Sequence, residues 1–252
     1  MSILPRPAFP VYDLVIPSLK KKIKFRPYLA KEEKVLSIAM ESEDITEIGN
    51  AIKLVLENCI MTKDVEIDKL ATFDIEYLFL NIRAKAVGED IELKVLYPDE
   101  DEELYVDVKL NINDIKVQET KGHTKTIKLD DEMSMIMRYP SFEYFIEEQF
   151  EMPTTDRDKL EKGLDLTASC VDKICKGEDV WTAEDVGKEE VLSFIGDLTS
   201  KQFELIQKFL DTMPQLRHVI KVQHPSRTVE VDGEEVPEEK EVILRGIVDF
   251  FI

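Results

Sequence analysis

The hydrophobic period of the chain changes at Gly88, and this change constrains the fold more than any other feature of the sequence. Between Thr72 and Val87, apolar side chains cover much of the circumference of an expected helix, a pattern typical of a helix buried on more than one side. After Gly88, apolar residues alternate with charged ones at 91–95 and 104–110, around an acidic loop at 98–103. This alternation predicts a β-hairpin. Helices followed by antiparallel strands indicate a fold of the α+β class.

A proline-rich arm, two strands and two helices are expected before this point. Prolines at positions 5, 7 and 10 predict that the first ten residues are extended, because proline fixes its own φ and restricts the preceding residue. Residues 11–16 and 22–28 fit a strand pair with one apolar and one basic face. Helices are expected at 29–41 and from Asp44, which begins a capping-box pattern. Thr72 is the expected N-cap of the third helix.

The segment after Pro140 is mostly helical in its pattern. Helices are expected at 142–150, 156–175, 188–197 and from a capping box at Thr199. Strands are expected at 114–119, 124–129, 216–222, 227–231 and 242–251, and residues 133–137 fit either a strand or a helix. The expected fold is therefore α+β, with a mixed N-terminal α/β layer, an antiparallel β-hairpin middle region, and a mostly helical C-terminal region with terminal strands. We place the domains at residues 1–90 (strand pair and helices), 91–139 (β-rich hairpin region) and 140–252 (helical region with a C-terminal hairpin).

The charge of the chain is strongly uneven. Its 252 residues carry a formal net charge of −20, which argues against nucleic acid as a partner because phosphate backbones require a cationic surface. Residues 1–34 hold eight lysines and arginines against three carboxylates, a local net charge of +5. We predict that a basic face formed by Lys20, Lys22, Lys24 and Arg26 binds an acidic partner. The alternative is a solvated strand face, since lysines on edge strands also prevent aggregation.

The chain ends in Phe250, Phe251 and Ile252. A solvated run of this kind would form a sticky apolar patch. We therefore expect it to pack into a core or an interface, which makes Phe250 and Phe251 candidate partner-binding residues.

Signatures of catalysis, cofactor binding and membrane insertion are missing from the sequence. Glycine-rich phosphate loops, His-Glu-x-x-His and Gly-x-Ser-x-Gly do not occur. Cys170 and Cys175 lie on an expected helix without sharing a face, and with Cys59 they are interpreted as thiols of a reducing compartment. No apolar run approaches the roughly 18 residues of a membrane span, and no secretory leader is expected. The sequence thus predicts no catalytic residues, no cofactor, no metal and no membrane span.

Two stretches are distinctive as motifs: KKKIKFRPYLAKEEKVL at 20–36 and FDIEYLFLNIRAKAVGE at 73–89. They resemble the baseplate protein family of T-even-type contractile-tailed bacteriophages, whose members are hub subunits or hub assembly proteins. Looser similarity extends from residues 11–17 to the terminal 246–251. The resemblance implies a role in building a tail, with phage baseplate hub proteins as partners.

Some relatives in this family carry cysteine pairs, like those of a zinc ribbon, in the hairpin after the third helix. Here Tyr97-Pro-Asp-Glu100 occupies that place and contains no cysteine. The zinc site is therefore not carried over to this chain.

The leading hypothesis is a non-enzymatic phage tail protein that acts in baseplate hub assembly, as a hub subunit or as an assembly chaperone. It would act in the host cytoplasm during assembly and could remain in the tail baseplate of the virion. An assembly-assisting enzyme with an unrecognised site and a soluble adaptor of the host cytoplasm are the alternatives. The oligomeric state is left open.

Overall fold

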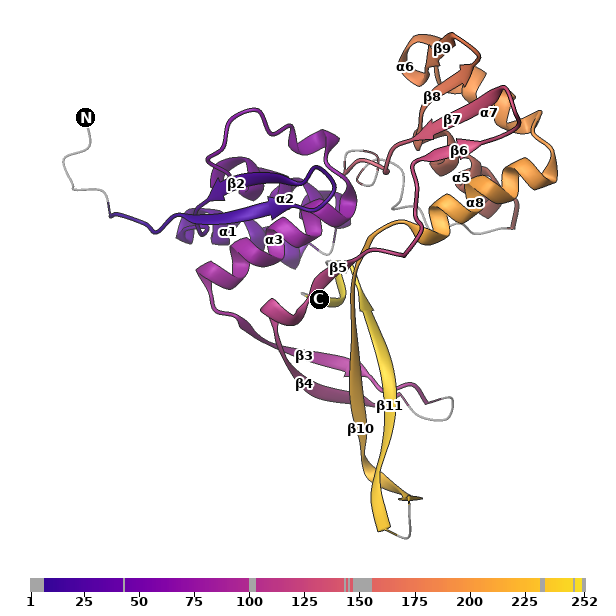
Figure 1. The fold of residues 1–252 in the computed structure, drawn as a ribbon. Coiled ribbons are helices and arrows are strands. Elements are labelled where there is room, and N and C mark those ends of the chain that lie inside the picture. Colours follow the sequence, from indigo (N-terminus) through magenta and orange to yellow (C-terminus); the bar gives the residue numbers. More distant parts are fainter. Residues whose placement is uncertain are drawn as a thin grey trace.

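The computed structural model describes residues 7–42, 44–99, 103–142, 144, 146, 156–231, 234–246 and 248–250. Within these residues the chain packs around three hydrophobic clusters. Figure 1 shows a helical N-terminal unit, a second helix-and-sheet unit, and a long two-stranded ribbon that projects away from both. None of the described helices is long and apolar enough to cross a membrane.

The first cluster lies between a two-stranded sheet and three helices. The strands pair antiparallel, as predicted, with Tyr12 opposite Phe25. Asp44 caps the second helix by accepting hydrogen bonds from the N–H groups of Thr46 and Glu47. The elements are β1 (Tyr12–Ile16), β2 (Lys21–Phe25), α1 (Ala30–Glu41), α2 (Ile45–Cys59), the 3₁₀ turn η1 (Ile67–Lys69) and α3 (Thr72–Ala86).

Helix α3 is shared by two clusters, which confirms the expectation that it is buried on more than one side. Leu78 and Phe79 are 0% and 2% exposed in the first cluster, whereas Leu80 and Ala84 pack in the second. The predicted N-cap is wrong. Ala71 occupies the cap position, because a β-bridge to Ser141 holds it in an extended conformation up to the first helical residue.

The second cluster joins one face of α3 to two hairpins. The predicted hairpin between residues 91 and 110 is confirmed, with Leu93 opposite Val108. A three-stranded sheet has the order β11-β10-β5. The elements are β3 (Asp90–Leu96), β4 (Tyr105–Asn111), the 3₁₀ turn η2 (Ile112–Asp114), β5 (Lys116–Gln118), β10 (Gln215–Val231), β11 (Glu234–Arg245) and the 3₁₀ turn η3 (Val248–Phe250).

The third cluster lies between a four-stranded sheet and the helices α5, α7 and α8, whose bounds are given below. The strand order is β6-β7-β8-β9, with every pair antiparallel. Helix α8 begins with the predicted capping box of Thr199 and Gln202. The elements are β6 (Thr126–Lys128), β7 (Met133–Met137), α5 (Asp156–Ser169), β8 (Val171–Lys176), β9 (Asp179–Thr182), α6 (Ala183–Val186), α7 (Lys188–Gly196) and α8 (Ser200–Thr212).

The predicted arrangement of the fold is wrong. The described residues form seven α-helices and eleven strands in four antiparallel sheets. Two of these sheets join strands from the expected middle and C-terminal regions: β5 pairs with β10, and β7 pairs with β8. Besides the expected terminal strands, which form β10 and β11, the region after residue 140 contributes β8 and β9, which were not expected. These pairings depend on contacts between segments distant in the sequence, which local periodicity does not report.

The segment around Cys175 gives the clearest single correction. The expected helix 156–175 ends at Ser169, and Val171–Lys176 is strand β8. It forms a strand because it is paired on both sides, by β7 and by β9. The expected helix 142–150 lies mostly outside the described residues, and the domain boundaries stay a prediction.

Candidate interaction surfaces

The predicted basic face is only partly at the surface. Lys22 and Lys24 point outward from β2, with side chains 68% exposed, and their ammonium nitrogens lie 3.1 and 3.8 Å from the carboxylate oxygens of Asp13. Lys20 is equally exposed and forms an ion pair with Glu119. Each of these three lysines therefore has a carboxylate neighbour, but in a solvated setting where an ion pair contributes little. Partner binding by these lysines stays a prediction.

Arg26, in contrast, is buried. Its residue is 7% exposed, and its guanidinium Nη2 lies 2.9 Å from Oε1 of Glu32. Burial alone would raise the pKa of Glu32, but hydrogen bonds from Arg26 and from the N–H of Leu29 outweigh it and lower that pKa. Arg26 therefore stabilises the first cluster and is not exposed beside the three lysines.

The C-terminal candidates have different outcomes. Phe250 is 1% exposed and packs in the second cluster, so in this structure it lies in a core, one of the two expected locations. Phe251 lies outside the described residues. Partner binding by either phenylalanine stays a prediction.

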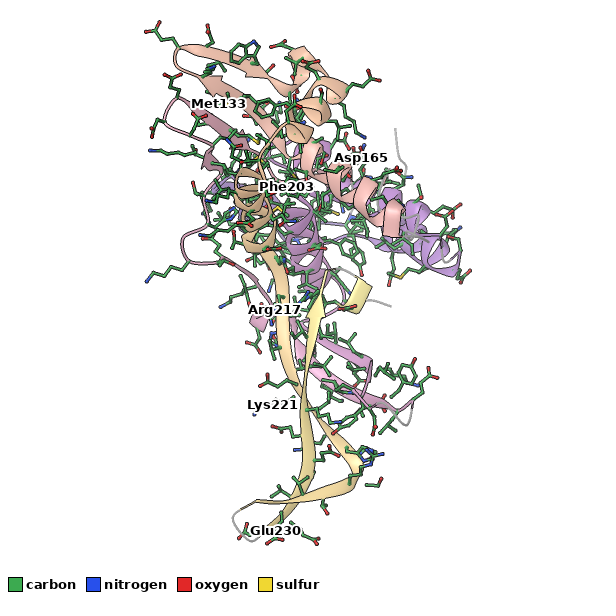
Figure 2. All side chains as sticks on the ribbon, turned by 90° about the vertical axis from the view of Figure 1, so that its right-hand side faces the viewer. Met133, Asp165, Phe203, Arg217, Lys221 and Glu230 are labelled. Atoms are coloured by element: carbon green, nitrogen blue, oxygen red, sulfur yellow. The ribbon has the colours of Figure 1, made fainter. Side chains whose placement is uncertain are left out.

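The most prominent surface feature is the β10–β11 ribbon, which sequence analysis divided into separate short strands. Figure 2 shows Arg217, Lys221 and Glu230 at successively greater distances from the helices along this ribbon. The half of the ribbon nearest the helices packs in the second cluster through Leu216, Ile220, Val222 and Leu244. The ladder is interrupted between Gln223 and Thr228 and then continues.

A clasp at this interruption fixes the ribbon to the β3–β4 hairpin. His224 is 4% exposed, and its Nδ1 accepts hydrogen bonds from the N–H groups of Ser226 (3.2 Å) and Arg227 (3.0 Å). Its ring meets the fully buried ring of Tyr97 edge-on at 5.0 Å. Arg227 forms an ion pair with Asp99, beside Tyr97. The ribbon is therefore anchored at its midpoint, and its distal part extends from a fixed base.

The distal part of the ribbon, residues 228–231 and 234–237, has a surface that no core covers. Its register places Val229 opposite Val236 and Glu230 opposite Glu235. Val229 is 41% exposed, and none of these distal residues belongs to a hydrophobic cluster of the described chain. Like charges directly opposite each other destabilise a ladder, so the tip is not optimised for the stability of the isolated chain.

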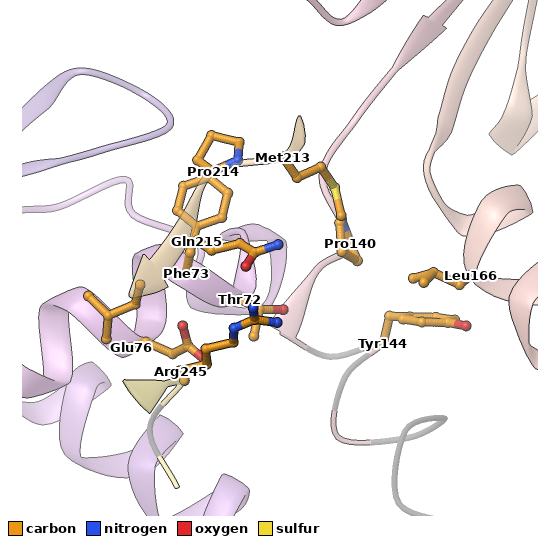
Figure 3. A pocket seen from close by; sticks show the side chains of 12 residues that line it. Thr72, Phe73, Glu76, Pro140, Tyr144, Leu166, Met213, Pro214, Gln215 and Arg245 are labelled. Atoms are coloured by element: carbon orange, nitrogen blue, oxygen red, sulfur yellow. The ribbon is translucent and has the colours of Figure 1, made fainter. Parts of the chain in front are cut away.

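A pocket of about 270 Å³ lies between the second and third clusters, beside the start of α3. Figure 3 shows Phe73 and Pro214 on one side of it, Tyr144 and Leu166 on another, and Arg245 near Glu76. Its lining includes no histidine or cysteine. The pocket therefore offers mainly apolar contact area.

Metal and thiol chemistry have little support in the described parts of the chain. No group of three or more histidine, cysteine, aspartate or glutamate side chains there could hold a metal ion. Burial raises the pKa of the Cys59 thiol to about 11 and that of Cys170 to about 12, so both stay protonated at neutral pH.

Free strand edges and a projecting ribbon are features of proteins that assemble with other proteins. The family of the T4 bacteriophage base plate protein matches residues 9–252, and the chain belongs to this family. It is therefore a phage baseplate protein, with other baseplate proteins as its implied partners. No curated protein and no solved structure shows significant similarity to the chain.

Proposed function

We propose that this baseplate protein acts without catalysis in the assembly of the baseplate hub, either as a hub subunit or as a chaperone that holds hub subunits in the host cytoplasm. The projecting β10–β11 ribbon is the observation that carries the proposal. A surface of this shape adds contact area for a partner, whereas it adds little to the packing of its own chain.

The energetics of the ribbon support this role. An isolated two-stranded hairpin is marginally stable in water, and beyond the clasp at His224 the ribbon has no covering layer. The opposed Glu230 and Glu235 and the exposed Val229 further disfavour the free tip. Contact with a partner would cover the valines and offset the repulsion.

A trimmed ribbon tests the proposal. Replacing residues 230–235 by Asn-Gly removes the tip and leaves Val229 and Val236 to close a two-residue turn, for which Asn-Gly is well suited. The matched control, Asp232→Asn, creates the same turn sequence at full length. In cells infected by phage that lacks its own copy, we expect the control to restore hub assembly and the trimmed chain to fail.

Both variants should melt within a few degrees of the parent, because the clasp and the second cluster are unchanged. Normal hub assembly by the trimmed chain would refute the role of the ribbon. Mass spectrometry of purified particles then separates the two forms of the proposal: a hub subunit is present in the particle, and a chaperone is absent.

The exposed lysines provide a second expected contact. Changing Lys20, Lys22 and Lys24 to glutamate, with Arg26 retained, should weaken binding to an acidic baseplate partner. The loss should shrink as salt is added, since exposed charges more than about 8 Å apart are screened at physiological ionic strength. Unchanged partner binding at low salt would remove this face from the proposed contacts.

A further inference from the structure

The outer edge of the four-stranded sheet carries a half-covered tryptophan beside an apolar pocket. Across the core-facing side of this sheet, Met135 lies opposite Ile174, and Ile174 lies opposite Trp181. Their exposed fractions rise from 0% to 9% to 43% toward the edge. The row of core side chains therefore continues into an open site at β9.

The open site is suited to a side chain of another protein. The pocket at Trp181 has a volume of about 270 Å³, below the roughly 300–1,000 Å³ of small-molecule pockets. Its walls come from the sheet and from α7 and include Ile174, Val191 and Phe194. Lys176 and Glu190 are its charged lining residues. Tryptophan in a partly formed apolar pocket is typical of the residues that dominate protein binding energy.

Strand β9 also offers unpaired backbone groups. It is the last strand of the sheet, and no backbone hydrogen bond from the rest of the described chain reaches its outer edge. In an antiparallel ladder, alternate residues turn their N–H and C=O away from the partner strand. Asp179 and Lys176 close a two-residue turn, so the backbone groups of Val180 and Thr182 point outward. Thr182 is the N-cap of α6, which leaves Val180 as the outward position within the strand. Its side chain is 56% exposed.

The charge around the pocket defines the occupant. Six acidic residues in the segment 178–190 are exposed, and two lysines lie against them: Lys188, which forms an ion pair with Asp165, and Lys176, which lines the pocket. The acidic residues lie on β9, on α6, on α7 and in the connecting turns: Glu178, Asp179, Glu184, Asp185, Glu189 and Glu190. A partner that enters this pocket must be complementary to negative charge.

We propose that β9 and the Trp181 pocket bind an extended segment of another protein in which a large apolar side chain is flanked by lysine or arginine. The segment pairs with the backbone of Val180 as an added strand, and its apolar side chain contacts Trp181. This site lies at the opposite end of the molecule from the ribbon tip (Figure 1), so it is separate from the contact in the proposed function.

Trp181 is the single tryptophan of the chain, so its fluorescence reports this site alone. The probe is the peptide acetyl-KLKLKL-amide, titrated into the full-length protein, with acetyl-ELELEL-amide as the charge control. We expect the lysine peptide to shift the emission of Trp181 to shorter wavelength, with an affinity that falls as salt is added. We expect no shift with the glutamate peptide.

Two substitutions at one position test the strand pairing. Val180→Pro removes the outward N–H, and proline is tolerated on an edge strand where that N–H faces solvent. Val180→Thr keeps the N–H and the β-branched shape. The proline variant should bind the lysine peptide roughly tenfold more weakly, as expected for loss of backbone bonds, while the threonine variant should bind it as the parent does.

Three results would overturn the proposal: no shift with the lysine peptide, equal responses to the two peptides, or parental binding by Val180→Pro. A shift that grows with protein concentration in the absence of peptide would mean that a second copy occupies the site, and it would overturn the proposal as well. The trimmed-ribbon variant should bind the peptide normally, which keeps failure of this site distinct from failure of the proposed function.

Discussion

Removing the guanidinium of the buried Arg26 should destabilise the protein far more than removing one of the exposed lysines of β2. The side chains of Arg26 and Glu32 are 9% and 4% exposed, with Nη2 and Oε1 2.9 Å apart. Arg26→Ala would leave the buried Glu32 carboxylate with only the exposed Lys31, at 3.2 Å, and the N–H of Leu29 as partners, and breaking a fully buried pair costs up to about 3–5 kcal/mol. Lys24→Ala removes a solvated side chain 3.8 Å from Asp13, and such exposed pairs contribute about 0–1 kcal/mol.

Urea unfolding followed by circular dichroism measures the difference. At neutral pH the midpoint for Arg26→Ala should fall well below that of Lys24→Ala, with similar slopes for the two variants. The double variant Arg26→Met, Glu32→Met should recover much of the loss, because no unpaired charge is then buried. Equal midpoints for Arg26→Ala and Lys24→Ala would refute the reasoning.

The pH dependence provides an independent check. The pKa of Glu32 is below its ordinary value of 4.5 in the folded protein, so ionised Glu32 contributes stability above the pKa of the unfolded chain. That contribution is lost as pH falls through the folded pKa. The stability gap between the parent and Arg26→Ala should therefore be full at pH 7 and narrow below pH 4.5. A gap that widened in acid would contradict the assigned role of Arg26.

Three further outcomes are expected. Leu78→Ala should cost roughly 2–5 kcal/mol, because Leu78 is fully buried and the site cannot collapse easily; calorimetry that finds a melting temperature within a degree of the parent would contradict this. A thiol reagent should modify Cys175 of the native protein well before Cys59, whose pKa is raised to about 11 by burial, and mass spectrometry of the labelled peptides identifies the order. Glu230→Lys should raise stability by about 0.2–1 kcal/mol, because it replaces a like-charge pair with an attractive one opposite Glu235, and an unchanged or lower urea midpoint would argue against the register at the tip.

Local patterns predicted the features whose causes are local. The cap of α8 follows from the spacing of Thr199 and Gln202, and the β3–β4 hairpin follows from the two-residue period around its loop. The two buried faces of α3 were also visible, because its apolar residues exceed the width of a single face. Each of these three features depends on residues within a single helix or a single hairpin.

The prediction failed where distant segments decide the structure. Arg26 follows Lys22 and Lys24 at every second position, so a continuous strand would place all three on one face. However, β2 ends at Phe25, and the N–H of Arg26 donates a hydrogen bond to the carbonyl of Cys59 at 3.0 Å. The strict alternation of faces is therefore lost one residue before it would have exposed Arg26. At the β9 edge, Ile174 and Phe194 border Trp181, and no local pattern in the sequence indicates that these three residues meet.

The root and the tip of the β10–β11 ribbon differ in how much they stabilise the folded chain. At the root, side chains of both strands are buried in the second cluster, and the His224 clasp holds the ribbon in place, so this part stabilises the folded chain. At the tip, Val229 is exposed and Glu230 lies opposite Glu235. Reversing the charge of one of these glutamates would make the ladder more stable than it is. A partner that supplies positive charge to the tip would replace the repulsion between Glu230 and Glu235 with attraction, which fits the contact proposed for the ribbon.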